Sequence, residues 1–305
     1  MWLIYWRIRV RVQLSVIVLA VLWVMPAGAQ RARSVTLRLE NDILALRGRD
    51  APADYDYTQG LVVGVELDSA PRWMPGWLSA CDPSGAEACV RARIEVGQRI
   101  YTPRRDAPNP IPGERPYAAW LYAGGGVARE SGRGVRSVEV EVGVTGPPAL
   151  GEQVQNGVHR LTGSERQQGW AHQTGFEPGI LLRIQEGRRW GGSAVRVEPA
   201  VRVELGNVRT AAAVGASGVL GRGAGPYARL GGRQEWVVRD IFLDGSTFGI
   251  RSTARKLPFV SEGEAAAGFR ARKWWVEYRF VARSREYRAQ PEGHAYGSLV
   301  LTVAR

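Results

Sequence analysis

The sequence has no long hydrophobic run after residue 30, and this limits its fold. A membrane-spanning helix needs about 20 consecutive apolar residues, and no later stretch approaches that length. Helical membrane proteins are therefore excluded for residues 30–305. Transmembrane β-barrels are not excluded, because their strands alternate apolar and polar residues and escape hydropathy scans.

Cysteine and histidine are scarce, with two cysteines and three histidines in 305 residues. Cys81 and Cys89 lie close together between two strand-like segments, in a chain that the N-terminus predicts to be exported. We therefore expect a disulfide that closes a small loop. A zinc site is not favoured, because neither cysteine has a neighbouring histidine.

Lysine is almost absent, although the protein is strongly basic. The formal charge of +12 comes almost wholly from arginine, since the only lysines are Lys256 and Lys273. This balance indicates an anionic partner. Nucleic-acid binding would require basic clusters or interleaved stacking aromatics, whereas these arginines are spread evenly along the chain. We therefore expect membrane phosphates as the partner, and no nucleic acid.

The N-terminus predicts export. Three arginines within residues 7–11 precede the apolar run 14–24, and Ala27-Gly28-Ala29 follows. This pattern is typical of a secretory signal peptide, residues 1–29, cleaved after Ala29. An uncleaved anchor helix is the alternative, but the run is short for a membrane span. Residues 30–305 show no internal repeat or linker, which predicts a single domain.

The clearest signal is a two-residue period. One segment places aliphatic residues on one face and charged residues on the other: Val195, Val197, Val201, Val203 and Leu205 against Arg196, Glu198, Arg202 and Glu204. A secreted β-sandwich would also alternate. The export signal, the number of segments and aromatic pairs that suit interfacial girdles favour a membrane barrel; the pairs are Trp274-Trp275 and Trp73 with Trp77.

Twelve alternating segments can be counted, an even number as in bacterial barrels. They start near Val35, Tyr57, Arg91, Tyr117, Arg136, Phe176, Ser193, Tyr227, Asp240, Phe259, Lys273 and Ala295. With periplasmic termini, the outer loops would be 48–56, 102–116, 146–175, 206–224, 246–258 and 283–294. The sequence thus predicts an all-β fold, an antiparallel transmembrane β-barrel of about twelve strands in the outer membrane.

One segment of an expected outer loop breaks the two-residue rule. Residues 149–161 follow two prolines and precede Gly163, which are start and stop signals of a helix. Gln155 and His159 would share a face of this short helix. A histidine on a helix that lies against a strand scaffold could act as a general base. A plain hydrogen-bonding role is the alternative, and it is the expectation for His172 and His294.

The first predicted hairpin is rich in oxygen ligands. These are Glu40, Asn41, Asp42, Asp54, Asp56 and Thr58. Hard cations such as calcium prefer such ligands. Charged lining of a barrel lumen is the alternative interpretation. No G-x-S-x-G motif occurs, so a serine hydrolase is unsupported.

Several motifs, in this order, resemble the outer-membrane lipid A deacylases of the LpxR type. They are Glu40-Asn41-Asp42, Asp56 to Gly60, Gly97 to Pro103, Arg115 to Tyr122, Gly143 to His159, Gly169-Trp170, Arg283 to Tyr287 and His294 to Gly297. The resemblance covers essentially the whole mature chain, and residues 143–159 are its most specific part. It implies an enzyme that removes the ester-linked 3′-acyloxyacyl group from lipid A in the outer leaflet and requires calcium.

The resemblance also implies roles for single residues. His159 would deprotonate a water that attacks the ester carbonyl, and Gln155 would fix the imidazole. Asn41 and Asp42 would hold calcium near the oxyanion, and Thr58 would help to orient the water or the metal.

Two further positions follow from the resemblance with less detail. Glu165 is an additional candidate for the same site. The family also uses a basic side chain on its third strand, which in this sequence can be placed only as Arg99 or, as a second choice, Arg104.

A non-catalytic outer-membrane barrel, either a pore or a lipopolysaccharide-binding envelope protein, is the rival hypothesis, because a fold does not by itself define a function. The two hypotheses differ in whether Asn41, Asp42, Thr58 and His159 converge at the outer rim of the barrel.

Overall fold

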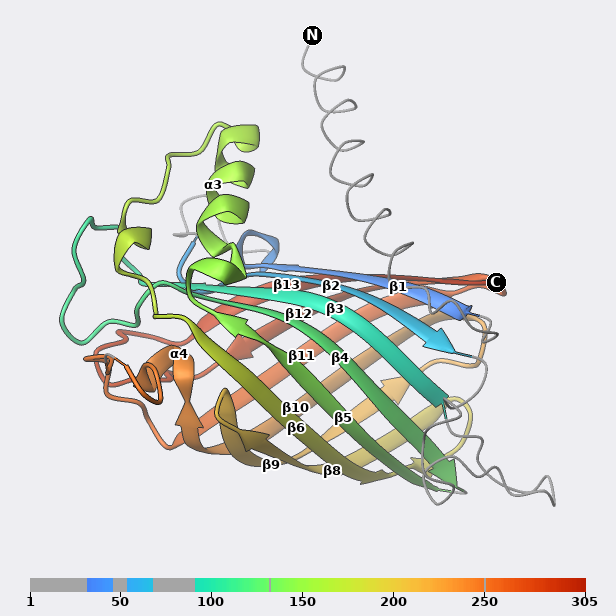
Figure 1. The fold of residues 1–305 in the computed structure, drawn as a ribbon. Helices are drawn as coiled ribbons and strands as arrows, with labels where there is room; N and C mark the ends of the chain where they lie inside the picture. Colours follow the sequence, from blue (N-terminus) through green and yellow to red (C-terminus); the bar gives the residue numbers. More distant parts are fainter. Residues whose placement is uncertain (1–31, 46–53, 68–90, 132, 250) are drawn as a thin grey trace, which may run out of the picture.

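The computed structural model describes residues 32–45, 54–67 and 91–305, apart from 132 and 250. These residues form a closed antiparallel β-barrel (Figure 1). Its twelve long strands are β1 (Ala32–Asn41), β2 (Asp56–Leu67), β3 (Arg91–Thr102), β4 (Ala118–Ser131), β5 (Gly134–Thr145), β6 (Glu177–Arg188), β8 (Val195–Gly206), β9 (Arg209–Leu220), β10 (Gly225–Asp240), β11 (Phe259–Arg270), β12 (Trp274–Arg283) and β13 (His294–Ala304). A two-residue strand, β7 (Trp190–Gly191), is added at one edge. Strand β1 pairs with β13 and β6 pairs with β8, which closes the sheet.

The predicted number of strands is confirmed, but only because one predicted strand is absent and one observed strand was not predicted. The strand predicted near Asp240 is wrong: β10 ends there, and Ile241–Asp244 form the short helix α4, which Asp240 caps by accepting from the Phe242 backbone NH at 2.9 Å. The outer loop predicted at 206–224 is also wrong, because it contains strand β9. Strand β9 is made largely of alanine, glycine and serine, so it lacks both hydrophobic contrast and β-propensity.

The predicted alternation is confirmed where it was strongest. Val195, Val201 and Leu205 are 53%, 53% and 47% exposed on the outside of the wall. Their charged neighbours point inward, where Glu204 pairs with Arg183 at 2.9 Å. Ion pairs of this kind, between neighbouring or next-but-one strands, line the lumen along its length, and the lumen holds a cavity of about 550 Å³. The interior of the barrel is therefore charged and polar, whereas its outer wall is apolar.

The two ends of the barrel differ in their connections. Longer connections, with the helices α3 (Gly151–Thr162) and α4, lie at one end, and the C-terminus and short turns lie at the other (Figure 1). Bacterial barrels place their longer loops outside the cell, so α3 lies at the outer rim. In the described residues, no helix is long and apolar enough to cross a bilayer.

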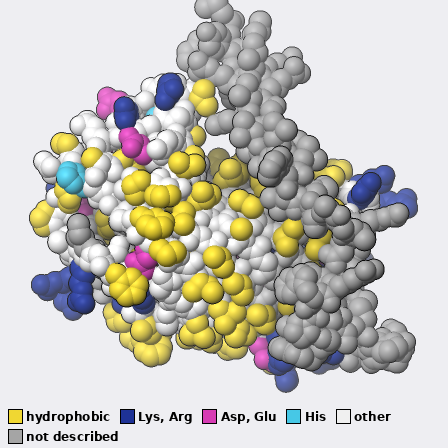
Figure 2. Space-filling view, in the orientation of Figure 1, with side chains coloured by type: hydrophobic (Ala, Val, Ile, Leu, Met, Phe, Trp, Pro, Cys, Tyr) yellow, Lys and Arg dark blue, Asp and Glu magenta, His cyan; other side chains and the backbone are white. Residues whose placement is uncertain are grey.

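The outer wall is apolar, and charged side chains gather towards its ends (Figure 2). Exposed aromatic residues lie near both rims, as interfacial girdles require: Trp236 and Phe259 form a cross-strand pair near the outer rim, and Phe269 stacks on Trp274 near the inner rim. Trp275, in contrast, bonds to Tyr227 inside the barrel, so only one member of that aromatic pair faces the membrane.

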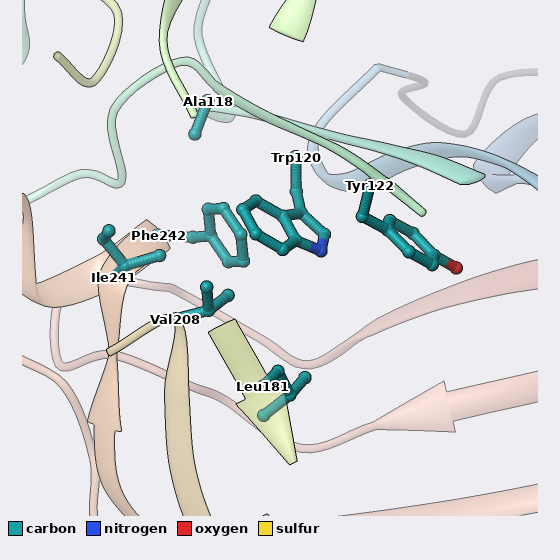
Figure 3. Close-up of a cluster of buried hydrophobic side chains, with 7 residues drawn as sticks. All are labelled: Ala118, Trp120, Tyr122, Leu181, Val208, Ile241 and Phe242. Atoms are coloured by element: carbon teal, nitrogen blue, oxygen red, sulfur yellow. The ribbon is translucent and has the colours of Figure 1, made fainter. Parts of the chain in front are cut away.

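An apolar cluster lies inside the barrel near its outer end. Phe242 of α4 packs beside Trp120 of β4 and above Val208, which joins β8 to β9 (Figure 3). The backbone NH of Ile241 donates to the Val208 carbonyl at 3.0 Å, which turns α4 inward. Ile241 and Phe242 therefore pack inside the outer end of the barrel rather than forming part of a membrane strand.

Candidate active site at the outer rim

Helix α3 packs against the outside of the barrel wall, where lipid would lie. Because side chains alternate across a strand, Arg99 and Tyr101 of β3 point into the lumen while Gln98 and Ile100 point outward, under the helix. Gln98 donates to the Ala149 carbonyl at 2.6 Å. Ile100 and Ala119 pack with Ala149 and Trp170 in a fully buried cluster.

The predicted helix 149–161 is confirmed with shifted bounds. Pro147–Ala149 form a 3-10 turn, η2, and α3 begins at Gly151 after Leu150, which adopts the left-handed region at φ 59°. The helix ends at Thr162 and is capped by Gly163, also left-handed, whose NH donates to the His159 carbonyl at 2.8 Å. A second turn, η3 (Gly169–His172), returns the chain to the wall and supplies Trp170.

His159 is buried, with both ring nitrogens engaged. Its Nδ1 bonds to the Glu165 main-chain oxygen, and its Nε2 lies 3.2 Å from Asp54 Oδ2. A carbonyl oxygen can only accept, so Nδ1 carries the hydrogen. Nε2 holds a lone pair in the neutral ring and donates to Asp54 only when the ring is protonated. Glu165 therefore contributes its backbone, and its side chain is exposed.

Asp54 is the centre of the site, which the sequence alone did not show. Its Oδ1 accepts from Gln155 Nε2 at 3.4 Å, and Gln155 Oε1 accepts from the Trp170 indole at 2.9 Å. Gln155 is 1% exposed. The predicted pair on one helix face is thus present, but Gln155 acts on the imidazole through Asp54.

Thr58 is connected to Asp54 through Thr102. The Thr102 hydroxyl donates to the Asp54 carbonyl at 2.6 Å, so Thr58 Oγ1, 2.6 Å from Thr102 Oγ1, must be the donor of that bond. Asp54 has φ 60°, an uncommon conformation for a residue other than glycine. These hydroxyls therefore support the backbone that presents the Asp54 carboxylate.

Asn41 and Asp42 lie at the outer end of β1. Asn41 Oδ1 accepts from the Ile43 NH at 2.8 Å and begins the 3-10 turn η1 (Asp42–Ala45). Asp42 is 6% exposed, and its Oδ2 accepts from the Tyr55 NH at 3.1 Å. Tyr55 directly follows Asp54, so this bond brings Asp42 close to the backbone of Asp54. Of the predicted cluster at the rim, Asn41, Asp42, Thr58 and His159 are therefore brought to one region.

The donors in this region fit calcium in kind but not in number. No group of three or more His, Cys, Asp or Glu residues that could hold a metal occurs in the described residues. Asp42 supplies a buried carboxylate and Asn41 an amide oxygen. Calcium takes six to eight oxygen ligands, including carbonyls and water, so these two residues could form part of a calcium site.

The structure does not bring Arg99 to His159. Arg99 lies in the lumen, where it makes two hydrogen bonds to Glu141 at 2.9 and 2.8 Å, on the opposite face of β3 from the helix. Arg104, the second choice, is at the rim: its guanidinium stacks 5.0 Å from the Tyr55 ring and donates to Glu292 at 2.8 Å. Its Nη1 is buried and makes no hydrogen bond within the described residues.

Of the two other carboxylates of the first hairpin, Glu40 follows the alternative interpretation of lumen lining, and Asp56 is buried in a network at the rim. Glu40 lines the lumen, where it accepts from the Tyr57 hydroxyl at 2.5 Å. Asp56 lies 3.3 Å from Arg115, which also donates to Glu286 at 2.8 Å. Burial would raise the pKa of Glu286, but Arg283 and Arg115 lower it to about 2.

The remaining histidines and some sequence predictions lie outside this site. His172 is exposed at the end of η3, and His294 is 3.7 Å from Glu286 in the buried rim network. The signal peptide, Cys81, Cys89 and the Trp73 and Trp77 pair lie outside the described residues.

The sequence held one signal that could have identified Asp54. It belongs to an Asp-Tyr-Asp-Tyr run, and only the second aspartate begins strand β2. Within a strand, Asp54 and Asp56 would point to the same face, because they are two residues apart. Asp54 instead precedes the strand, and its side chain turns outward to His159.

In the hydrolysis that the resemblance implies, the Asp54→Asn variant should be on the order of ten- to a hundred-fold slower, because it removes the carboxylate that would stabilise the protonated imidazole. Asparagine tolerates the left-handed conformation, so only the charge beside Nε2 is removed. Steady-state kinetics should show the loss in kcat with little change in KM. A wild-type kcat in this variant would mean that Asp54 does not act on His159.

Comparisons with known proteins agree with this architecture. The sequence matches the family described as "Outer membrane protein LpxR" over residues 14–305. The structure is similar to LpxR from Salmonella typhimurium, with a TM-score of 0.73 and 21% identity over 89% of this chain and 100% of that one. The β domain of the Bordetella autotransporter BrkA is less similar, with a TM-score of 0.48 and 16% identity over 90% of this chain and 100% of that one.

No curated protein matches the chain in sequence. The family match, however, spans nearly the whole chain, and the barrel architecture shown above agrees with it. The chain belongs to the LpxR family of outer-membrane lipid A deacylases.

Proposed function

We propose that the protein hydrolyses the ester of the 3′-linked acyloxyacyl chain of lipid A, with His159 as the general base. One observation carries this proposal: on the membrane side of the barrel, the Glu165 carbonyl orients the buried imidazole through Nδ1, and Nε2 lies 3.2 Å from the Asp54 carboxylate, which would stabilise the protonated ring. A histidine buried and oriented in this way, beside a lipid-facing wall, is suited to take a proton from water.

The arrangement supports a two-step hydrolysis. His159 Nε2 accepts a proton from a water whose oxygen attacks the ester carbonyl, which gives a tetrahedral intermediate. When the C–O bond breaks, the imidazolium returns the proton to the sugar oxygen, and the products are a fatty acid and a free hydroxyl. Asp54 favours this cycle because its carboxylate stabilises the imidazolium that forms between the two proton transfers.

Stabilisation of the oxyanion is assigned to the residues at the rim. Among the residues that the structure describes, the buried Nη1 of Arg104 has no hydrogen-bond acceptor, and the guanidinium lies over the Tyr55 ring. Calcium, if held by Asn41 and Asp42, would act as a Lewis acid towards the carbonyl oxygen. Charge placed where the oxyanion develops is commonly the largest single contribution to such a reaction.

Because the site lies on the outside of the barrel wall, a membrane lipid could reach it directly. Outward-facing residues of β3 and β4 lie under α3, and Val96 and Leu39 of the neighbouring wall are partly exposed. Acyl chains in the outer leaflet would therefore lie against the same wall that carries the helix. A lipid could enter from the bilayer without passing through the charged lumen.

The test is mass spectrometry of lipid A from a host that expresses the wild-type chain, extracted after detergent treatment with added calcium. We expect loss of one acyloxyacyl group from the 3′ position. No mass change, with a barrel shown to be folded by its heat-modifiable migration in gels, would contradict the proposed reaction. Loss of an acyl chain from another position would agree with a deacylase but refute the 3′ assignment.

Replacement of Asp42 with alanine should weaken activation by calcium. Loss of one carboxylate should raise the calcium concentration for half-maximal activity by on the order of ten-fold, because affinity follows the charge of the ligands. A calcium titration of the initial rate measures this, with Glu186→Ala as the control, since Glu186 is an exposed acid near the opposite end. An unchanged titration would place any calcium site away from Asp42.

A further inference from the structure

The turn that presents Asp54 to His159 has an uncommon backbone conformation. Asp54 has φ 60° and Asp56 has φ 62°, so both adopt the left-handed region although neither is glycine. Residues in this region keep their conformation only where the surrounding structure holds them. The contacts of Asp56 therefore help to determine where the Asp54 carboxylate lies.

Three residues from two other outer connections hold Asp56, and we call them the Asp56 clamp. They are Arg115, between β3 and β4, and Glu286 and Gln290, between β12 and β13. Arg115 Nη1 donates to the Asp56 carbonyl at 3.0 Å, and its Nε lies 3.3 Å from Asp56 Oδ1. Gln290 Nε2 donates to Asp56 Oδ2 at 2.8 Å. The clamp thus engages the backbone and both carboxylate oxygens of Asp56.

The clamp lies on the lumen side of the turn, opposite His159. The Arg115 guanidinium lies 5.3 Å from the Tyr101 ring and donates to Glu286 at 2.8 Å. Tyr101 and Glu286 both line the lumen, whereas His159 lies on α3, which packs outside the wall. The turn therefore crosses the rim of the wall, with Asp54 directed to the helix and the next residue but one directed to the lumen.

The members of the clamp also hold one another. The side chains of Arg115 and Asp56 are 1% and 0% exposed. The Glu286 NH donates to Gln290 Oε1 at 2.6 Å, which fixes the orientation of the Gln290 amide. Movement of one member would leave a buried charge without its partner, which is strongly unfavourable. Asp56 is thus held in one position.

The contacts of the Asp54 carboxylate itself are long. Its Oδ1 lies 3.4 Å from Gln155 Nε2, and its Oδ2 lies 3.2 Å from His159 Nε2, whereas hydrogen bonds between nitrogen and oxygen are commonest at about 2.9–3.0 Å. Contacts of this length restrain the carboxylate only weakly. The backbone of the turn, which Thr102 holds at Asp54 and the clamp holds at Asp56, therefore decides where the carboxylate lies.

We propose that Arg115 is a positioning residue for the hydrolysis, which acts through Asp56 to keep the Asp54 carboxylate beside His159 Nε2. The inference deepens the proposed function and rests on it, since the imidazolium that Asp54 stabilises forms during that reaction. Because Arg115 acts from the lumen side, it does not touch a lipid on the outer wall. Its replacement should therefore lower kcat and leave KM nearly unchanged.

Arg115→Lys and, separately, Asp56→Asn test this inference in the full-length protein in detergent. Lysine keeps a cation beside Glu286 but lacks the fork of donors that holds the Asp56 carbonyl and carboxylate together. Asparagine keeps the size of Asp56 without its charge. We expect kcat to fall on the order of ten-fold in each variant, with KM within about two-fold of the wild type.

Folding of both variants is checked by heat-modifiable migration in gels. If Arg115→Lys does not fold, Asp56→Asn decides the question alone. A wild-type kcat in the folded Asp56→Asn variant would overturn the inference.

A double-mutant cycle separates positioning from a general loss of stability. The Asp54→Asn background has no carboxylate to position, so Asp56→Asn should lower kcat there by less than about two-fold. An equal loss in both backgrounds would show that the clamp does not act through Asp54. Arg183→Gln is the matched control, since Arg183 pairs with Glu204 at 2.9 Å in the lumen and lies outside the clamp. It should keep the wild-type kcat.

The ring of His159 provides a readout that needs no turnover. Gln290→Leu removes one bond of the clamp without a change in charge. It should change the ¹⁵N chemical shift of His159 Nε2 at constant pH, because the carboxylate beside this atom moves, while the exposed His172 keeps its shift. An unchanged His159 shift would overturn the inference. A changed shift in a protein that does not deacylate lipid A would support the positioning and refute the proposed reaction.

Discussion

Replacement of His159 with alanine should abolish deacylation and leave the barrel folded. Removal of a general base costs on the order of 10² to 10⁴ in rate, and here the imidazole also connects Asp54 to the Glu165 carbonyl. The side chain contributes no ladder hydrogen bond to the sheet, since α3 packs on the wall from outside. Mass spectrometry of lipid A and heat-modifiable migration in gels measure the two parts of this prediction.

His172→Ala is the matched control for that experiment. His172 lies in the same outer connection but is exposed and outside the hydrogen-bonded network of the site. It should retain wild-type activity. Residual activity of the His159→Ala variant within a factor of a few of the wild type would assign the base to another group, and lost heat-modifiability would show a structural role instead.

Substitution of Gly151 with alanine should reduce deacylation about as strongly as a direct change in the site. A Cβ at Gly151 would lie 2.4 Å from the Trp170 ring and 2.7 Å from the Ala119 Cβ on the wall. The start of α3 must therefore move outward and displace Trp170, which holds Gln155. A misplacement of about 1 Å in a catalytic group can cost on the order of 10²-fold in rate.

Gly157→Ala provides the matched control on the same helix. A Cβ at Gly157 meets nothing within 4 Å, and alanine favours a helix by about 1 kcal/mol relative to glycine. This variant should keep full activity. Initial rates of the two variants, with a gel assay of barrel folding, compare the same chemical change at a packed and an open position. Equal rates would mean that contact between α3 and the wall does not position His159.

Part of the site could be predicted from the sequence because it rests on local pattern. Gln155 and His159 are four residues apart between helix start and stop signals, and they do share the buried face of α3. The resemblance supplied Asn41, Asp42 and Thr58, and the structure brings them to the same rim as His159.

Other parts of the site could not be predicted, because they depend on which face of the wall a residue occupies. Arg99 and Gln98 are adjacent in the sequence, yet one pairs with Glu141 in the lumen and the other supports α3 outside. Asp54 becomes a partner of His159 only because it precedes β2 in a left-handed conformation. No spacing in the sequence specifies either outcome.

The sequence by itself determined the fold class, since a two-residue period of aliphatic and charged side chains suits a wall with lipid on one side and a charged lumen on the other. It did not determine the wall in full: β9, rich in alanine and glycine, is identified only by its pairing with β8 and β10. Only the tertiary structure decided that the helix packs outside the barrel and that Asp54, Gln155 and His159 meet there. The reason is physical: strand periodicity is a local property of the chain, whereas the site joins Asp54 to Gln155, 101 positions apart. Their contact depends on the pairing of β2 to β5 in one wall and on the packing of α3 against that wall.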